Sequence, residues 1–210
     1  MIKIHRETDM FVAIDVQNDF CPGGALPVVD GDAVVPRING LSPRFAHFVA
    51  TQDWHTPGHH SFAGSHTGKA PYDTIELHYG MQTLWPDHCV QGTAGAAFHP
   101  ALDLTAAQLI LRKGFRPTID SYSAFFENDK KTHTGLSGYL RDRGFKRVFF
   151  AGLATDFCVA YSAIDAIRQG FESVVLIDAC RAIDVNGSLD AALREMKDVG
   201  VTLIESNEIG

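Results

Sequence analysis

Met10-Phe-Val-Ala-Ile14 is a short apolar run that ends directly before a carboxylate, Asp15. Apolar runs of this length, bounded by polar residues, are typical of buried strands. Three further runs have the same form, and each also leads to a reactive side chain: 47–51 before Asp53, 108–112 before Lys113, and 147–151 before Cys158. Because the carboxyl ends of parallel strands meet at one edge of a sheet, we expect these four side chains to face a common site.

The pattern of the remaining chain predicts an α/β fold. Three segments have a helical pattern, 136–143, 155–169 and 187–199, and two more apolar runs, 173–178 and 201–205, read as the last strands. Parallel strands need crossover connections, and these are usually helices that cover both faces of the sheet. We therefore predict a three-layer α/β fold with an open six-stranded parallel sheet and helices on both faces, in a single domain over 1–210.

The helix predicted over 155–169 has the clearest pattern. Its apolar residues recur at i, i+3, i+4 and i+7 and form one stripe, which consists of Phe157, Ala160, Tyr161, Ile164 and Ile167. Thr155 or Asp156 can cap its first amides, and Gly170 can end it. Cys158 then lies in the first turn, where the helix dipole presents partial positive charge.

Composition and charge restrict the class of protein. The chain has 210 residues and a net charge of −7, which argues against nucleic acid or an anionic membrane as its main partner. No segment has the pattern of a signal peptide, and no apolar run approaches the ~20 residues of a membrane span. The four cysteines show no paired spacing. We expect a reduced, cytoplasmic protein that acts on a small molecule.

Cys158 is the candidate nucleophile. A lone cysteine is more often a small core residue. In the first turn of a helix, however, amide N–H groups lower the pKa of a thiol, and a thiol at its ordinary pKa is only a few per cent thiolate at neutral pH. The position of Cys158 therefore favours catalysis, whereas Cys21, Cys89 and Cys180 lack that setting and are expected to be structural.

Asp15 and Lys113 are the candidate partners of the thiol. Taken singly, Asp15 is also typical of a turn and Lys113 of a solvated strand end. A strand-end carboxylate beside a thiol can act as a general base if something holds its geometry. A cation about 4 Å away contributes on the order of 4 kcal/mol at an effective dielectric of 20, which favours both the carboxylate and the thiolate. We predict a Cys–Asp–Lys arrangement.

A second group of residues has the composition of a metal site. Asp53 and His55 lie two residues apart after a strand, so both can face the same side, and His88 is a third candidate. Two histidines and one carboxylate suit zinc, iron or manganese, with zinc as our first expectation. Histidines in polar loops are as often merely solvated. We leave His59 and His60, which lie between these residues, outside the predicted ligand set.

The long connection over 58–100 carries these histidines. A loop of that length in a compact domain is usually functional or disordered, and the histidines favour function. Aromatic residues near the predicted site, Phe20, Trp85 and Tyr122, could form the walls of a flat pocket. They could equally be ordinary core residues.

Several longer blocks, in order along the chain, match one family. They are Ala13-Ile-Asp-Val-Gln-Asn-Asp-Phe20, Thr51-Gln-Asp-Trp-His55, Trp85-Pro-Asp-His-Cys-Val90, Arg112-Lys-Gly114, Asp120-Ser-Tyr-Ser-Ala-Phe125 and Gly152-Leu-Ala-Thr-Asp-Phe-Cys-Val159. On these blocks the chain resembles the nicotinamidases of the isochorismatase-like cysteine hydrolases over nearly its whole length. The Asp-Trp-His and Trp-Pro-x-His-Cys blocks are typical of nicotinamidases, since isochorismatases and carbamoylsarcosine amidases generally lack this metal set.

The resemblance implies a catalytic role for each matching position. Cys158 would be the nucleophile, Asp15 the proton shuttle, and Lys113 the group that stabilises and orients both. The backbone N–H groups of Ala154 and Cys158 would bind the oxyanion. The peptide bond before Ala154 would be cis, as it often is in this family.

The resemblance also implies the ligands and the assembly. One divalent metal ion would be bound by Asp53, His55 and His88. The substrate pocket would be lined by four apolar or aromatic residues, Phe20, Leu26, Trp85 and Tyr122. Family habit implies a homodimer.

The implied reaction is hydrolysis of nicotinamide to nicotinate and ammonia through a thioester on Cys158, as a step of NAD salvage, with pyrazinamide as a second substrate. The pyridine nitrogen would bind the metal while aromatic side chains hold the ring. The alternative is a related cysteine hydrolase that acts on another small amide or an enol ether, with a merely structural metal. A non-haem iron oxygenase would leave Cys158 beside Asp15 and Lys113 unexplained, and a redox module would lack its Cys-x-x-Cys pair.

Overall fold

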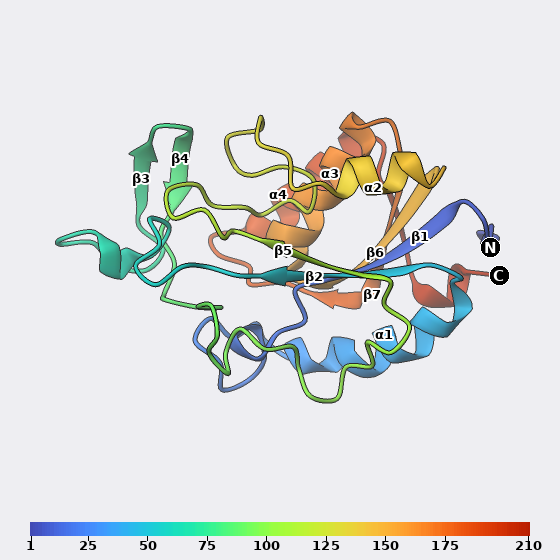
Figure 1. Cartoon of the computed structure of the whole chain (residues 1–210), viewed down its shortest axis with the longest axis horizontal. Coiled ribbons are helices and arrows are strands. Elements are labelled where there is room, and N and C mark those ends of the chain that lie inside the picture. The colour runs from blue at the N-terminus through green and yellow to red at the C-terminus, as the bar shows by residue number, and fades with distance from the viewer.

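The computed structural model describes residues 1–210, which fold around a six-stranded parallel sheet (Figure 1). Across the sheet the strands follow the order β5-β2-β1-β6-β7-β8, and every neighbouring pair is parallel. Their bounds are β1 (Asp9–Ile14), β2 (Phe48–Asp53), β5 (Leu109–Lys113), β6 (Arg147–Leu153), β7 (Glu172–Arg181) and β8 (Thr202–Ile204). The predicted open parallel sheet is confirmed, although β7 extends past its predicted end at residue 178.

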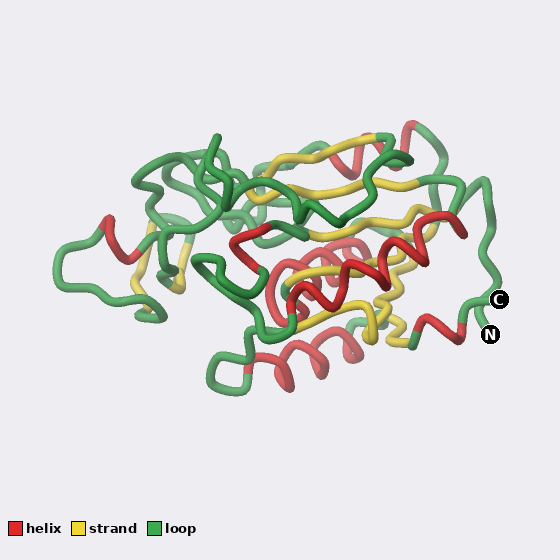
Figure 2. The backbone as a smooth tube through the Cα atoms, turned by 90° about the horizontal axis from the view of Figure 1, so that it is seen from below, coloured by secondary structure: helices red, strands yellow, loops and turns green.

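Helices cover both faces of this sheet, as predicted (Figures 1 and 2). One face carries α1 (Val34–Leu41), and the other carries α2 (Leu136–Asp142), α3 (Ala160–Arg168) and α4 (Ser188–Asp198). The central strand β1 serves both cores because its side chains alternate: Phe11 belongs to the core under α1, and Val12 to the core under the other three helices. No helix combines the length and the apolar character needed to cross a bilayer.

The helix α1 has no counterpart in the sequence prediction. It contains Pro36 and Gly40, the two residue types least favourable in helices. Burial compensates for this, because Val34, Ile38 and Leu41 pack into the core beneath the sheet. Tertiary packing therefore overrides the local propensity.

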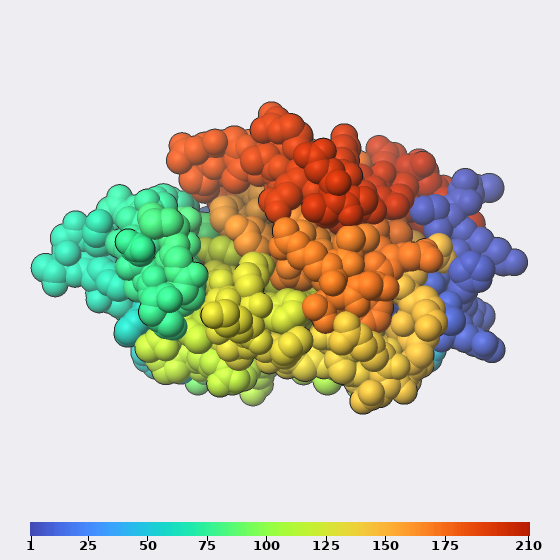
Figure 3. Space-filling model, turned by 90° about the horizontal axis from the view of Figure 1, so that it is seen from above, coloured from blue at the N-terminus to red at the C-terminus, as the bar shows by residue number.

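A short antiparallel hairpin is the second element that the sequence did not predict. It consists of β3 (Thr74–Leu77) and β4 (Gly80–Thr83) and lies inside the long connection over 58–100. The segment that carries it projects at one end of the molecule, where Figure 3 shows it in teal and green. The connection is thus ordered structure beside the sheet.

The segment predicted as a helix over 155–169 begins with a turn of π-helix, Thr155–Val159, and continues as α3. Gly170 follows its end with φ +86°, as expected for a left-handed terminating residue. The predicted side-chain cap is wrong. The Asp156 carboxylate instead accepts hydrogen bonds from the backbone N–H groups of Ile183 and Asp184, so it binds a neighbouring loop.

The predicted apolar stripe of this helix also divides into two parts. Ala160 and Ile164 are buried in the core, as expected. Phe157 and Tyr161 are only partly buried, and both rings contact Tyr122, at centroid distances of 5.6 Å and 5.1 Å. These two aromatic residues therefore belong to a cluster at the edge of the sheet.

Gly152 allows β1 and β6 to approach closely near that edge. It pairs with Ile14 across the sheet and has φ +123°. A Cβ atom at this position would overlap the carbonyl oxygen of Ile14, the residue before Asp15. The absence of a side chain at Gly152 thus fixes where Asp15 leaves the sheet.

We expect Gly152→Ala to lower the free energy of unfolding by about 3 kcal/mol or more, since it combines a strained backbone with backbone overlap. Urea denaturation measures the change. Gly138→Ala is the matched control, because Gly138 lies in α2 with no atom near its Cβ position. That variant is expected to be neutral or stabilised by up to about 1 kcal/mol. Equal destabilisation of both variants would contradict the packing argument.

Candidate active site

Lys113 lies at the centre of a fully buried cluster at the carboxyl end of β5. Its Nζ is 2.8 Å from Asp15 Oδ2 and 3.0 Å from Asp53 Oδ1. It also donates to the Ser121 carbonyl oxygen at 2.7 Å and lies 3.5 Å from Cys158 Sγ. The structure thus brings the three predicted catalytic residues together and connects them to the predicted metal ligands.

Burial and ion pairing act in opposite directions on the charges of this cluster. Burial raises the pKa of the Asp15 carboxyl, and the Lys113 ammonium offsets only part of that rise. Burial alone would lower the pKa of Lys113, but the Asp15 and Asp53 carboxylates hold it well above its ordinary value. Lys113 therefore stays protonated, and Asp15 is a stronger proton acceptor than an exposed aspartate.

The pKa of the Cys158 thiol lies well above its ordinary value, so the prediction that helix amides lower it is wrong. Burial is the main cause of the rise; the Lys113 ammonium opposes it, and the carboxyls of Asp15 and Asp53 add to it. A helix terminus can be recognised in the sequence, whereas the cost of burying a thiolate depends on the whole fold. The thiol at rest is protonated, so its activation requires a base.

The Asp15 carboxyl is held in one orientation by its surroundings. Thr51 Oγ1 donates to Asp15 Oδ1 at 2.6 Å and accepts from the Asp15 backbone N–H at 3.1 Å. Asp15 itself has φ +47°, a conformation that non-glycine residues seldom adopt. This turn directs the carboxyl from the end of β1 toward Lys113.

The three predicted metal ligands form one buried group whose ligand atoms all lie within 4.8 Å of one another. His55 Nε2 is 2.9 Å and His88 Nε2 is 3.5 Å from Asp53 Oδ2. The Nδ1 atom of His55 donates to the Gly114 carbonyl oxygen at 3.0 Å, and that of His88 donates to the Pro86 carbonyl oxygen at 2.8 Å. A carbonyl can only accept, so each ring directs its Nε2 atom toward the carboxylate. This arrangement fits a divalent metal ion.

His59 and His60 lie outside the metal group. His59 is buried, but its Nε2 donates to the Arg116 carbonyl oxygen at 2.7 Å and its Nδ1 lies 2.8 Å from Ser61 Oγ. His60 is exposed. Both ring nitrogens of His59 are therefore engaged elsewhere, and its ring packs against that of His55 at a centroid distance of 4.6 Å.

Gln17, which was not predicted as a site residue, positions the metal group. Gln17 is buried, and its side chain pairs with the backbone of Asp53: Oε1 accepts from the N–H at 2.7 Å, and Nε2 donates to the carbonyl at 2.8 Å. Gln17 lies in the block Ala13–Phe20 that carries the family resemblance. A glutamine there had no apparent chemistry, so only its partners reveal its role.

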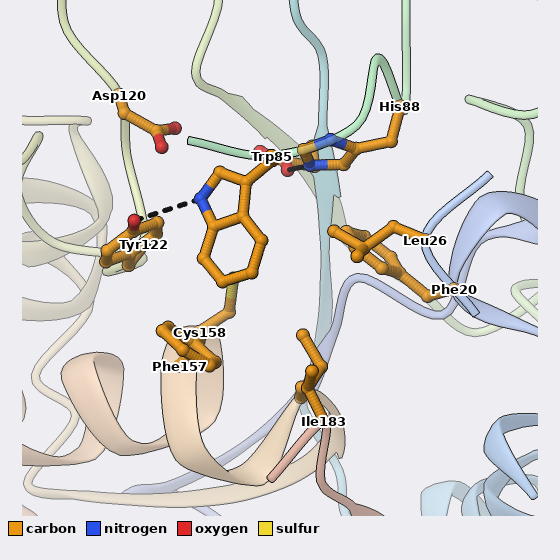
Figure 4. A pocket seen from close by; sticks show the side chains of 11 residues that line it. Phe20, Leu26, Trp85, His88, Asp120, Tyr122, Phe157, Cys158 and Ile183 are labelled. Atoms are coloured by element: carbon orange, nitrogen blue, oxygen red, sulfur yellow. Dashed lines mark hydrogen bonds and ion pairs between the residues drawn. The ribbon is translucent and has the colours of Figure 1, made fainter. Parts of the chain in front are cut away.

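A cavity lies beside Cys158 (Figure 4). The four predicted pocket residues all line it, and Ala154 and Cys158 lie at its wall. Trp85 Nε1 donates to Tyr122 Oη at 3.0 Å, and Figure 4 shows Phe20 and Leu26 across the cavity from this pair. Asp53 and His88 reach the same cavity, so the metal group and the thiol share it.

The cavity is also lined by three residues that were not predicted to belong to it: Asp120, Phe157 and Ile183. Asp120 belongs to a block that carries the resemblance, and Phe157 was assigned to the apolar stripe of a helix. Ile183 lies in a loop without any pattern. The peptide bond between Leu153 and Ala154 is cis, as the resemblance implies.

The model of the isochorismatase domain matches residues 9–208. The chain belongs to the isochorismatase family. A nicotinamidase from Acinetobacter baylyi is 58% identical to this family member over 94% of the chain and 92% of its own length. The solved structure of an Acinetobacter baumanii nicotinamidase and pyrazinamidase is 54% identical, superposes with a TM-score of 0.95, and matches 96% of this chain and 98% of that one.

Two more distant structures of the isochorismatase fold hold ligands. PnC1 from L. infantum, in complex with nicotinate, is 40% identical with a TM-score of 0.87, and the match covers all of this chain and 98% of that one. Pyrazinamidase from Pyrococcus horikoshii, in complex with zinc, is 35% identical with a TM-score of 0.75, over 94% of this chain and 98% of that one.

Gly114 packs directly against the metal group, and we expect Gly114→Ala to weaken metal binding about 10- to 100-fold, as other disturbances of the groups around metal ligands do. Its φ is +68°, and a Cβ atom would lie 2.6 Å from His55 Cε1 and 3.0 Å from Asp53 Oδ1. Competition with a chelator, read by elemental analysis, measures the affinity. Gly58→Ala is the matched control, because Gly58 has φ +69° and open space around it. Unchanged metal affinity in the Gly114 variant would refute the role.

Proposed function

We propose that this protein hydrolyses nicotinamide to nicotinate and ammonia through a thioester on Cys158. The observation that carries the proposal is the shared cavity: a thiol, a metal-binding group and aromatic walls face one space. The names of the relatives support it, since the similar proteins from both Acinetobacter species are nicotinamidases.

Substrate binding uses two kinds of contact. Trp85, Tyr122, Phe20 and Leu26 enclose the pyridine ring from the two sides of the cavity. Asp53, His55 and His88 would hold one divalent ion, and we propose zinc because two histidines and a carboxylate suit it. When bound, this ion supplies a Lewis-acid site for the pyridine nitrogen, which orients the ring. Fixing the ring in this way places the carboxamide carbon near Cys158 and contributes several kcal/mol to the rate, on the order of what positioning provides.

The first half of the reaction forms the thioester. Asp15 takes the proton of the Cys158 thiol, and the sulfur attacks the carboxamide carbon. Backbone N–H groups of Ala154 and Cys158 stabilise the oxyanion, a contribution of about 10²–10³-fold per donor. The C–N bond then breaks, and Asp15 returns its proton to the departing ammonia. Lys113 keeps both reacting groups in place throughout, since it contacts the carboxylate and the sulfur.

The second half of the reaction hydrolyses the thioester. A water molecule enters where ammonia has left, and Asp15 removes one of its protons. The hydroxyl attacks the thioester carbon, the C–S bond breaks, and the sulfur of Cys158 takes the proton back from Asp15. The product acid loses its proton to solvent and leaves as nicotinate, and the site returns to its starting state.

Several broader properties belong to the same proposal. Pyrazinamide is a second substrate, because it carries the same carboxamide on a similar flat ring. Residues 1–210 act as one domain, because the first strand, β1, and the last strand, β8, belong to the same sheet. The protein works in the cytoplasm, where it serves NAD salvage, and it forms a homodimer.

We expect Cys158→Ala to reduce ammonia release from nicotinamide by at least about 10⁴-fold, as removal of a nucleophile does. Binding of nicotinate, measured by calorimetry, should survive because the cavity walls remain. Cys180→Ala is the control: Cys180 is also buried and free, but it does not line the cavity. Substantial turnover by the Cys158 variant would exclude the thioester.

Removal of the metal tests the role of Asp53, His55 and His88. We expect ammonia release to fall at least about tenfold after chelation and to return when zinc is added. Binding of nicotinate should weaken in parallel, because the ring loses one of its anchors. Full activity and full nicotinate affinity in metal-free protein would contradict this role and favour a merely structural metal.

A further inference from the structure

The hairpin β3–β4 sends one polar side chain into the body of the molecule. Met81 is 68% exposed, whereas its neighbour Gln82 is 1% exposed. Side chains of a strand alternate between its two faces, so Gln82 is the inward-facing residue of β4. A buried glutamine on a projecting hairpin must satisfy both ends of its amide in the protein.

The amide nitrogen of Gln82 reaches the wall of the substrate cavity. Its Nε2 donates to Tyr122 Oη and to Asp120 Oδ2, each at 2.9 Å. Tyr122 Oη also accepts from Trp85 Nε1 at 3.0 Å. Gln82 and Trp85 thus converge on one hydroxyl, and three of the residues in this chain of hydrogen bonds line the cavity (Figure 4).

The amide oxygen of Gln82 also forms two hydrogen bonds. It accepts from Tyr79 Oη at 2.9 Å and from Asn128 Nδ2 at 3.2 Å. Asn128 in turn accepts from the backbone N–H of Tyr122 at 3.1 Å through its own oxygen. Gln82 therefore joins the hairpin to the loop that carries Tyr122 at two points.

We propose that Gln82 is a positioning residue for substrate recognition, which holds Tyr122, and through it Trp85, in the orientation that encloses the ring of the substrate. The residue touches neither the thiol nor the metal ligands. It contacts the cavity wall at Tyr122 and at Asp120, whose Oδ1 lies 3.9 Å from His55 Nε2. This inference rests on the proposed function for the identity of the substrate. The positioning itself can be measured without any substrate.

The kinetic test uses Gln82→Leu, which keeps the approximate size of the side chain and removes both ends of the amide. We expect contacts of the wall with the ring to be similar in the bound substrate and in the transition state, because the bonds change at the carboxamide. Their loss should therefore raise KM for nicotinamide about tenfold while kcat changes less than about threefold. Met81→Leu, one residue away on the exposed face, should leave both constants unchanged.

The spectroscopic test labels the protein with 5-fluorotryptophan and records ¹⁹F resonances. The chain has two tryptophans, Trp54 and Trp85, and a Trp54→Phe variant assigns them. Trp54 stacks on Arg112, with the guanidinium 3.8 Å from its ring, and serves as an internal control. Gln82→Leu should shift and broaden the Trp85 resonance and leave that of Trp54 in place.

The two readouts separate the inference from the proposed function. If the wild-type protein releases no ammonia from nicotinamide, the function fails, but a selective change at Trp85 still supports the positioning role. Unchanged KM together with an unchanged Trp85 resonance overturns it. Equal shifts of both tryptophan resonances, with metal lost and kcat reduced, also overturn it, because Gln82 would then serve the fold as a whole.

Discussion

The buried ammonium of Lys113 is the interaction on which the site depends. Two carboxylates, Asp15 and Asp53, are buried around it, and without the cation they would repel each other in a region that excludes water. Removal of one partner from a buried ion pair typically costs about 3–5 kcal/mol, since it leaves charge uncompensated. One carboxylate belongs to the proposed proton shuttle and the other to the metal group. The same side chain therefore stabilises the fold and connects the two halves of the chemistry.

The register of the parallel strands determines how the reactive side chains come together. β2 and β5 pair so that Asp53 lies directly beside Lys113, and β1 and β6 pair so that Ile14 lies beside Gly152. Residues far apart in the chain thus end at the same height on one edge of the sheet. Loops then add what strands cannot provide: a carbonyl for each histidine ring, a side-chain clamp on the backbone of Asp53, and aromatic walls.

The sequence predicted the sheet and the convergence of the reactive residues because apolar runs and the polar residue after each run are local features. It did not predict α1, since Pro36 and Gly40 conceal a helix that tertiary burial stabilises. The predicted direction of the pKa shift of Cys158 was wrong for a similar reason, because burial of the thiol depends on the whole fold. Gln17 and Gln82 were overlooked because a glutamine has no intrinsic reactivity, and its partners appear only in three dimensions.

The depth of Cys158 also determines which reagents can damage or block the protein. Oxidants and alkylating agents attack thiolates that are exposed, whereas Cys158 as a residue is 7% exposed and its thiol is protonated at rest. Peroxide therefore finds little reactive sulfur, although the chain contains four free cysteines, all buried. A molecule that modifies Cys158 quickly must first displace solvent from the cavity and then meet Asp15 as a base. Small, uncharged, flat electrophiles satisfy both conditions, so selective covalent inhibitors of this protein are expected to have these properties.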